Sequence, residues 1–351
     1  TEAFVGAEDL VFLETFDKEG LDILKQIIVS SQPRKAMGLD GITVADLKAL
    51  PESAIEDVLC MFRSVLTTGE IPEPWLQMRL ALIPKKAGAL SIKDLRPLSI
   101  AVVLYRLFSK MLLKLCFNCQ QRVHPHSLGG IPKRDALSAF LPMAVRIEHV
   151  LLLRGMAIAT AIDTQKFFDC IPHEVAMDSL RHIGISDLVL RAWRCFLLKS
   201  KRFVQLHGSI HSEGIPAKRG IPQGDPLSMV AAAATLGSWL QALDDVPRPI
   251  GVSRYVYVDD RFMLAVGRDC AAELQCALEL TEQWDLARGF NTRPKTQVLK
   301  LGKAQDIVWE DGQAVASVAD LEYLGVPIAA SVQKPGAFFE PVVQKCLDIL
   351  D

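Results

Sequence analysis

Apolar residues in the first third of the chain recur at every third or fourth position. This spacing, over residues 8–30 and again over residues 101–122, predicts amphipathic helices that bury one face. A third helix is expected to open near Thr43, after a glycine-bearing turn. Residues 80–84 form a short apolar run that predicts a strand ending in a basic turn. The first part of the chain is therefore expected to be largely helical.

Short apolar runs separated by turns or helices dominate the rest of the chain. Those that predict strands lie at residues 156–162, 202–206, 210–213, 254–258, 262–266, 297–301 and 321–327. Helices are expected between them, one from the Asp225-Pro226 pair to about residue 243 and one over residues 271–288. This order predicts an α+β fold in which helices pack on one face of an antiparallel sheet.

The most apolar stretch, residues 229–243, contains polar residues and predicts a buried core helix rather than a membrane span. No signal sequence follows Thr1, and the missing initiator methionine indicates a fragment or a processed piece. Half of the 351 residues are hydrophobic, enough for a large core. We therefore expect a soluble, intracellular protein with no membrane partner.

Positive charge is concentrated in two blocks, although the net charge of the chain is −2. Residues 79–134 hold eleven Lys or Arg and one acid, and residues 191–219 hold seven basic residues and one acid. Blocks of this kind can bind phosphates even on a chain that is nearly neutral, although a solvated surface is the alternative.

Two of the eight cysteines, Cys116 and Cys119, form a Cys-x-x-Cys pair with His124 and His126 downstream. A zinc site is one interpretation of this spacing. Because both cysteines lie in a helical apolar pattern and no second pair follows, reduced core thiols are the favoured interpretation.

Acidic residues stand at two predicted strand ends. Asp163 closes the run at residues 156–162, and Asp259 and Asp260 sit in a tight hairpin between two apolar strands. Adjacent carboxylates with apolar flanks repel each other and lose hydration, and a divalent cation such as Mg²⁺ relieves both costs. Three such carboxylates would suit a two-metal site for phosphoryl transfer, whereas an exposed acidic turn is the alternative.

Several motifs resemble those of reverse transcriptases. Residues 257–260, Tyr-Val-Asp-Asp, resemble the Tyr-x-Asp-Asp box, and residues 219–228 resemble the block Gly-[Ile/Val]-Pro-Gln-Gly-x-Pro-Leu-Ser. The remaining blocks follow in family order at residues 38–42, 95–100, 163–169, 295–297 and 323–325. The chain thus resembles the enzymes of LINE-type (non-LTR) retrotransposons, which are related to group II intron reverse transcriptases.

The resemblance implies the fingers and palm of a right-hand polymerase, with the antiparallel sheet in the palm. Residues 1–150 would form the fingers, largely helical with a basic strand-turn region, and residues 151–330 the palm. Within the palm segment, residues 162–218 would include fingers-proximal helices and a hairpin. Residues 331–351 would begin a truncated thumb.

The resemblance also implies a catalytic set. Asp163 and Asp259 would bind two Mg²⁺ ions, which Mn²⁺ could replace, with Asp260 in support and the carbonyl of Thr164 as a further ligand. Lys295 would act as the general acid for the pyrophosphate leaving group.

Two positions depart from the family pattern. Thr292 stands where relatives usually carry Asn, three residues before the lysine, which puts Lys295 in question. Arg261 follows the two aspartates where a hydrophobic or small residue is commoner, and it could pair with a metal ligand.

Other motif positions would contact the incoming nucleotide. Arg96 would hold the triphosphate, with help from Lys86 or its neighbour Lys85. Phe168 would be the steric gate against a ribose 2′-hydroxyl, unless it is a core aromatic, and Gln223 and Gly224 would form the floor under the nucleotide. Basic residues that would follow the nucleic-acid backbone, or else form a solvated face, are Arg106, Lys110, Lys114 and Arg219.

The function implied is RNA-directed DNA polymerisation, with an RNA template, a DNA primer and dNTPs as partners, in the nucleus if the element is of LINE type. Three alternatives stay open. One is a catalytically silent nucleic-acid-binding scaffold, another a group II intron-type maturase, and the third an RNA-dependent RNA polymerase. The sequence carries no signal for an oligomeric state.

Overall fold

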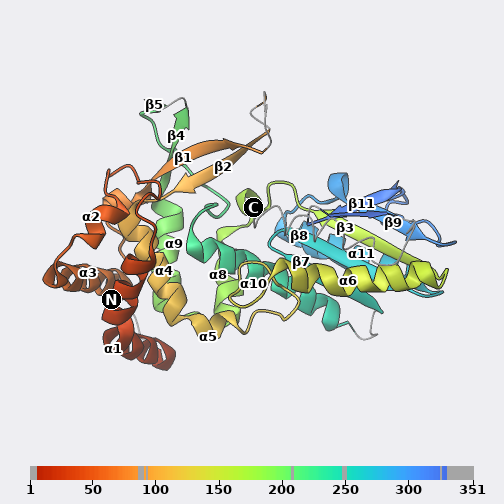
Figure 1. Ribbon diagram of the computed structural model, residues 1–351, viewed down its shortest axis with the longest axis horizontal. Helices are drawn as coiled ribbons and strands as arrows, with labels where there is room; N and C mark the ends of the chain where they lie inside the picture. Colours follow the sequence, from red (N-terminus) through yellow and green to blue (C-terminus); the bar gives the residue numbers. More distant parts are fainter. Residues whose placement is uncertain are drawn as a thin grey trace. The chain divides into compact units, whose positions relative to one another are not determined.

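Two compact units, each built from two stretches of sequence, make up the computed structural model (Figure 1). The first unit comprises Thr1–Arg122 and Ile171–Ala231, and the second comprises Val123–Cys170 and Ala232–Asp351. The residues described are 6–85, 91, 94–206, 209–246, 251–324 and 326–329, so the expected thumb segment lies outside them. The two units interleave in sequence, and residues 171–218 of the stretch expected to hold fingers-proximal helices and a hairpin lie in the first unit.

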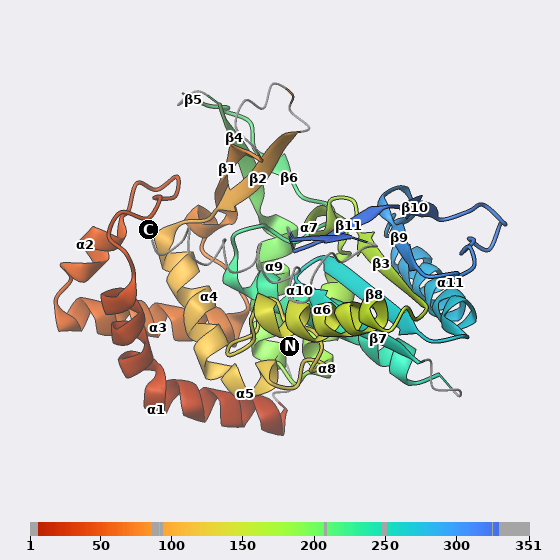
Figure 2. The same ribbon diagram turned by 45° about the vertical axis from the view of Figure 1, so that its right-hand side comes forward.

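Helices dominate the first unit, as predicted. They are α1 (Ala7–Ser30), α2 (Val44–Lys48), α3 (Glu52–Thr68), α4 (Val103–Leu115), α5 (Phe117–Gln120), α8 (His173–His182) and α9 (Asp187–Lys199). Thr43 caps α2 by accepting a hydrogen bond from the Asp46 amide at 3.2 Å, as a residue at a helix N-terminus should. The helix predicted over residues 101–122 is interrupted at Cys116, between α4 and α5. Figure 2 shows α1 beside both α3 and α4.

A small sheet completes the first unit. Its strands are β1 (Gln77–Pro84), β2 (Leu95–Ile100), β4 (Lys201–Leu206), β5 (Ser209–Ile210) and β6 (Ile215–Pro216), in the order β2-β1-β4-β5 with β6 also on β4. All pairs are antiparallel except β1 with β4. We expected residues 202–206 and 210–213 to form a hairpin that turns at Gly208 and Ser209. Gln205 and Leu206 do pair with Ile210 and Ser209, but Ser209 lies in the strand and residues 211–213 do not, and Gly208 is outside the described residues.

The second unit is built on a five-stranded sheet. Its strands are β3 (Ala157–Asp163), β7 (Val252–Tyr257), β8 (Asp260–Val266), β9 (Gln297–Leu301) and β10 (Ala316–Val318), in the order β10-β9-β3-β8-β7. Only β9 and β10 pair in parallel, so the predicted antiparallel sheet is confirmed. The run expected as one strand at residues 321–327 is instead a hairpin of β11 (Asp320–Tyr323) and β12 (Val326–Ala329). Leu324, with φ of 53°, begins the reversal that the apolar pattern did not reveal.

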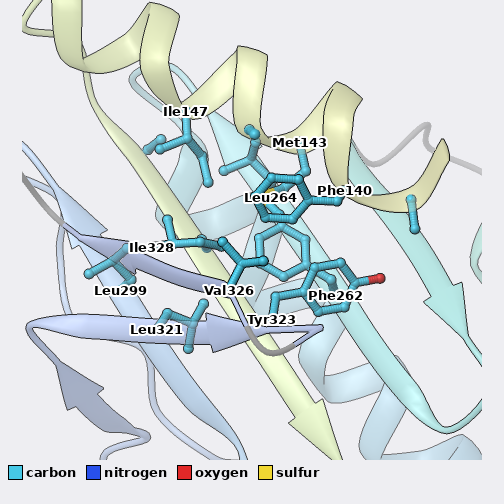
Figure 3. Packing of buried hydrophobic residues seen from close by; sticks show 14 of the residues in the cluster. Phe140, Met143, Ile147, Phe262, Leu264, Leu299, Leu321, Tyr323, Val326 and Ile328 are labelled. Atoms are coloured by element: carbon cyan, nitrogen blue, oxygen red, sulfur yellow. The ribbon is translucent and has the colours of Figure 1, made fainter. Parts of the chain in front are cut away.

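Helices cover both faces of this sheet, which corrects the expectation of a single covered face. On one face, Phe262 and Leu264 pack with side chains of α6 (Ala136–Leu152), as Figure 3 shows. Consecutive strand residues point to opposite faces, so Arg261 points the other way, where it meets α11 (Cys270–Arg288). Asp163 and Asp260 therefore lie at the end of a sheet that packs against α6 on one face and α11 on the other.

One helix of the described residues, α10 (Pro226–Asp244), is long and apolar enough to cross a membrane by length and composition. Most of its apolar window is buried inside the protein. This burial agrees with the core helix expected for residues 229–243.

We predict that Leu274→Ala, on the buried face of α11, lowers the free energy of unfolding by about 2–5 kcal/mol, because Leu274 is 0% exposed and its loss leaves a cavity. Leu286 lies on the same helix and is 65% exposed, so Leu286→Ala should stay within about 0.5 kcal/mol of wild type. Urea denaturation of both variants measures the difference. Equal effects would contradict the packing of α11 described above.

Candidate active site

The register between β3 and β8 sets two of the predicted aspartates opposite each other. Asp163, the last residue of β3, is the pairing partner of Asp260, the first residue of β8. Asp260 also pairs with Tyr257 of β7, which leaves Val258 and Asp259 in the hairpin turn. Segments that lie about a hundred residues apart thus bring the predicted carboxylates to one end of the sheet.

The hairpin turn holds Val258 in an unusual backbone conformation. Its φ of 60° lies in the left-handed region, which a β-branched residue rarely adopts. Strain of this kind persists only where surrounding contacts impose it, and it is concentrated at functional sites.

The three aspartates repel one another at this end of the sheet. Burial, followed by the negative charges of Asp259 and Asp163, raises the pKa of Asp260 to about 6. The Lys295 ammonium opposes this rise but does not cancel it. A cation bound among these carboxylates would relieve the repulsion.

Lys295 already supplies one positive charge. It ends the short 3-10 helix Arg293–Lys295, and its Nζ lies 2.5 Å from Oδ2 of Asp163. Both side chains are about half exposed, so solvent and ligands can reach the pair. Together with Asp260, Glu322 and Tyr323, they line a cavity of about 380 Å³.

The donor chemistry at this cavity fits a divalent cation. Its carboxylate oxygens are hard ligands of the kind that Mg²⁺ prefers, and an ammonium group already binds one of them. Within the described ranges, however, no three His, Cys, Asp or Glu side chains stand grouped as a finished metal site. Any metal ion held by Asp163 would compete with the Lys295 ammonium for that carboxylate.

Thr164 and Phe168 follow Asp163 in the same unit. The Thr164 side chain is buried and accepts a hydrogen bond from Arg261 at 3.1 Å. Phe168, in α7 (Phe167–Cys170), is 8% exposed and packs edge-on against Phe167, so only a small part of its ring reaches the surface.

We expected that Arg261 could pair with a metal ligand when no metal is bound, but its carboxylate partner is Asp285, and toward the metal site it bonds only the Thr164 side chain among the contacts described. Its guanidinium donates to Asp285 on α11, on the face of the sheet away from Phe262. The alternation of side chains along β8 accounts for this, because the residue after Asp260 must point to the opposite face.

Gly129 is a site residue that sequence reasoning missed. Residues 126–128 run along β7 through backbone hydrogen bonds with Val256 at 2.8 and 2.9 Å, which brings Gly129 against the hairpin turn. A Cβ at Gly129 would collide with the Val258 backbone nitrogen and lie 2.9 Å from the Tyr257 carbonyl carbon. The Gly129-Gly130 pair was the available signal, because adjacent glycines often mark a close backbone approach.

The predicted floor residues, Gln223 and Gly224, lie in the first unit. The Gln223 carbonyl accepts a hydrogen bond from the Ser99 amide at 2.8 Å. Gly224 has φ of 111°, and a Cβ there would lie 2.7 Å from the Ser99 carbonyl oxygen, so the position requires glycine. Next to them, the buried Asp225 carboxylate accepts from Ser109 and from Trp193, each at 2.8 Å.

The other predicted contacts are also in the first unit. Arg96 is exposed on β2, Arg219 is exposed in the loop before α10, and Lys86 lies outside the described residues. On α4, Arg106 donates to the Ala36 carbonyl at 2.5 Å and Lys114 approaches Gln26 at 3.4 Å. Lys110 is half-buried, and burial lowers its pKa. Their roles toward a nucleotide or nucleic acid stay predictions.

The zinc interpretation gains no support. Cys116 is buried, and burial raises the pKa of its thiol, which disfavours the thiolate that zinc binds. Cys119 donates instead to the Gly184 carbonyl at 3.0 Å, and among the described residues the two cysteines are not part of any group of three or more His, Cys, Asp or Glu side chains that could hold a metal ion.

We predict that Gly129→Ala lowers the free energy of unfolding by about 1–3 kcal/mol, because the new methyl group must displace the backbone of the hairpin. Gly155→Ala is the matched control in the same unit, since its nearest neighbouring atoms stand 3.5 Å away at ordinary contact distance. Thermal denaturation compares the two. A Gly129→Ala protein as stable as the control would refute the close approach.

Comparison with known proteins agrees with the geometry. The family model described as reverse transcriptase (RNA-dependent DNA polymerase) matches residues 83–328. A Pol polyprotein from a type-1 retrotransposable element R2 of Nasonia vitripennis is 26% identical, over 76% of this chain and 26% of its own length. The RNA-directed DNA polymerase from the mobile element jockey of Drosophila melanogaster is 23% identical, over 78% of this chain and 30% of its own length. The chain thus spans less than a third of each of these relatives.

A solved structure shares the fold. Apo telomerase from Candida tropicalis, truncated from its C-terminal domain, matches with a TM-score of 0.50 and 12% identity, over 80% of this chain and 59% of that chain. This likeness concerns the fold alone. Since the family match covers well over half of the chain and contains every predicted catalytic residue, the chain belongs to the reverse transcriptase family.

Proposed function

We propose that this chain is the RNA-directed DNA polymerase of a non-LTR retroelement, which extends a DNA primer along an RNA template with dNTPs. The observation that carries the proposal is the pairing of Asp163 with Asp260 beside Asp259, in a chain of this family. The first unit would serve as the fingers and the second as the palm. The retroelement context rests on relatives that are named as retrotransposon polymerases, and a nuclear location would follow from it.

Two divalent ions, Mg²⁺ or in its place Mn²⁺, would be held by Asp163, Asp259 and Asp260, with the Thr164 carbonyl as a further ligand. Family membership supports dependence on a divalent metal. When bound, the ions would favour ionisation of the primer 3′-hydroxyl and offset the charge that develops on pyrophosphate. The raised pKa of Asp260 supports this assignment, because, after burial, the negative charges of Asp259 and Asp163 contribute to it.

Lys295 would have two roles in sequence. In the structure it neutralises Asp163, and on metal binding it would release that carboxylate and turn toward the leaving group. There its ammonium would donate a proton to pyrophosphate as the general acid. Its place in the cavity with Asp163 and Asp260 supports the role.

Residues of the first unit would bind the nucleotide. Arg96, with Lys86, would hold the triphosphate, because a planar guanidinium grips phosphate oxygens in pairs. Gln223 and Gly224 would lie under the base, and the Ser99 bond to the Gln223 carbonyl supports a preorganised backbone there. Arg106, Lys110, Lys114 and Arg219 would contact template or primer phosphates.

We predict that Asp259→Asn lowers the rate of primer extension by at least about 100-fold, because the amide cannot supply the negative charge that the metal ions require. Its melting temperature should not fall, since the change relieves repulsion with Asp260. Asp269→Asn is the control, because Asp269 is exposed and follows the opposite end of β8. Extension on RNA and DNA templates, with dNTPs and NTPs compared, measures the activity.

Normal extension by Asp259→Asn would refute the assignment of the site. A wild-type chain that binds primer–template but incorporates nothing would favour a silent scaffold. Preferred incorporation of NTPs would instead indicate an RNA polymerase.

We also predict that Phe168→Val reduces discrimination against ribonucleotides by about tenfold or more, because the smaller side chain leaves room for a 2′-hydroxyl. Phe167→Val is the matched control, since it removes the same atoms from the adjacent ring, which is 2% exposed. The control should lose stability without a change in sugar selectivity. Competition between dNTP and NTP on one template measures the ratio, and equal ratios in the two variants would exclude Phe168 as the gate.

A further inference from the structure

Arg261 lies fully inside the second unit, directly after Asp260 on β8. It is 0% exposed, and its guanidinium lies 5.1 Å from the ring centroid of Trp239. Burying an arginine is expensive unless its charge is paired and its donors are bound. A buried guanidinium must therefore have a charged partner, and the expected partner, a metal ligand, is not the one found.

Asp285 of α11 supplies the paired charge. Arg261 Nη1 donates to Oδ1 of Asp285 at 3.0 Å, and Nη2 donates to Oδ2 at 2.9 Å. Asp285 is 1% exposed, so water does not screen the pair. Two parallel hydrogen bonds fix the plane of the guanidinium and thereby the orientation of the β8 backbone that carries it.

A third bond links the guanidinium to the first catalytic segment. Nη2 of Arg261 also donates to Oγ1 of Thr164 at 3.1 Å, and Thr164 directly follows Asp163. One side chain thus binds the residue after Asp163 while itself being the residue after Asp260. Arg261 therefore links the segments that carry Asp163 and Asp260 on the face of the sheet that packs against α11.

Asp285 extends the network to the lysine. Its Oδ2 accepts a hydrogen bond from Oγ1 of Thr292 at 3.0 Å. The Thr292 carbonyl in turn accepts from the Lys295 amide at 3.1 Å, which closes the short helix ending in Lys295. The two departures from the family motifs, Arg261 and Thr292, therefore meet at one carboxylate.

We infer that the Arg261–Asp285 pair is a positioning centre for the catalytic set. It holds, through one buried network, the three segments that carry Asp163, Asp260 and Lys295. This inference rests on the proposed polymerase function and deepens it. Arg261 and Asp285 act through these segments, and the metal ions would be bound by the carboxylates on the other face of the sheet.

Stability alone does not account for the pair. A buried ion pair is often matched or exceeded in stability by well-packed apolar residues, whereas its directional bonds specify geometry. A positioning role therefore predicts that replacing both partners by leucine preserves the fold but misplaces the carboxylates. Mutation of residues that orient metal ligands in this way typically weakens metal binding by about 10- to 100-fold.

The test compares Arg261→Leu/Asp285→Leu with wild type as the full chain. Each protein is bound to an RNA template, a DNA primer with a 2′,3′-dideoxy end and the matching dNTP, so that no turnover occurs. Electron paramagnetic resonance then measures Mn²⁺ affinity, and circular dichroism measures folding. We expect about 10- to 100-fold weaker Mn²⁺ binding with native secondary structure.

A control removes another Arg–Asp pair of the same unit, whose side chains are 13% and 38% exposed. Arg254 on β7 forms an ion pair with Asp244 of α10 and has no bond to the segments named above among the contacts described. The double variant Arg254→Leu/Asp244→Leu should bind Mn²⁺ as wild type does. A comparable loss in this control would show that any broken pair weakens the metal site, and would overturn the specific role of Arg261.

Milder variants decide the outcome if the leucine pair fails to fold. Thr164→Val and Thr292→Val together remove two network bonds but leave the buried charges paired. Weaker Mn²⁺ binding by several-fold would support the positioning role, and unchanged binding would overturn it. If wild type itself neither binds Mn²⁺ nor extends primers, the proposed function fails rather than this inference.

Discussion

Two carboxylates face each other across the β3–β8 pair, and a third follows in the adjoining turn. This repulsive arrangement is held because β3 is buried in mid-sheet between β8 and β9, which fixes its register. A slip of one residue would turn Ala157 and Ala159 out of the core shown in Figure 3. The hydrophobic pattern of the strand thus sets the position of Asp163. The free energy of core packing offsets the repulsion between Asp163 and Asp260.

The sheet is supported differently on its two faces. Toward α6 and the β11–β12 hairpin, the contacts are apolar and contribute the usual stabilisation of a core. Toward α11, a buried guanidinium and carboxylate occupy positions that apolar residues could fill. Paired hydrogen bonds set direction as well as distance, and this polar network lies directly behind the strand ends that carry Asp163 and Asp260.

The first unit uses a similar device around its Gln-Gly turn. The buried Asp225 carboxylate accepts bonds from Ser109 on α4 and Trp193 on α9, and burial raises its pKa. The Ser99 amide then binds the Gln223 carbonyl, and Gly224 permits the close approach to β2. Each unit thus has a buried carboxylate with no proposed chemical role, Asp225 in the first and Asp285 in the second. Each one accepts hydrogen bonds beside a segment that does have a proposed role, the Gln223-Gly224 turn or the strand end at Asp260.

The sequence by itself determined the family and the strands near residues 156–162, 254–258 and 262–266, and it singled out three aspartates as candidate site residues. These follow from local patterns, namely apolar runs, turn residues and contiguous motifs, which need no knowledge of distant contacts. Apolar periodicity does not say which elements cover a sheet or where a run reverses, so the second covered face and the β11–β12 hairpin came only from the structure.

Tertiary structure alone decided which residues far apart in the sequence come into contact. Arg261 adjoins Asp260 in sequence but bonds to Asp285, and Gly129 contacts a turn nearly 130 residues away. Such contacts depend on strand alternation and on the packing of whole elements, which act over distances in space rather than along the chain.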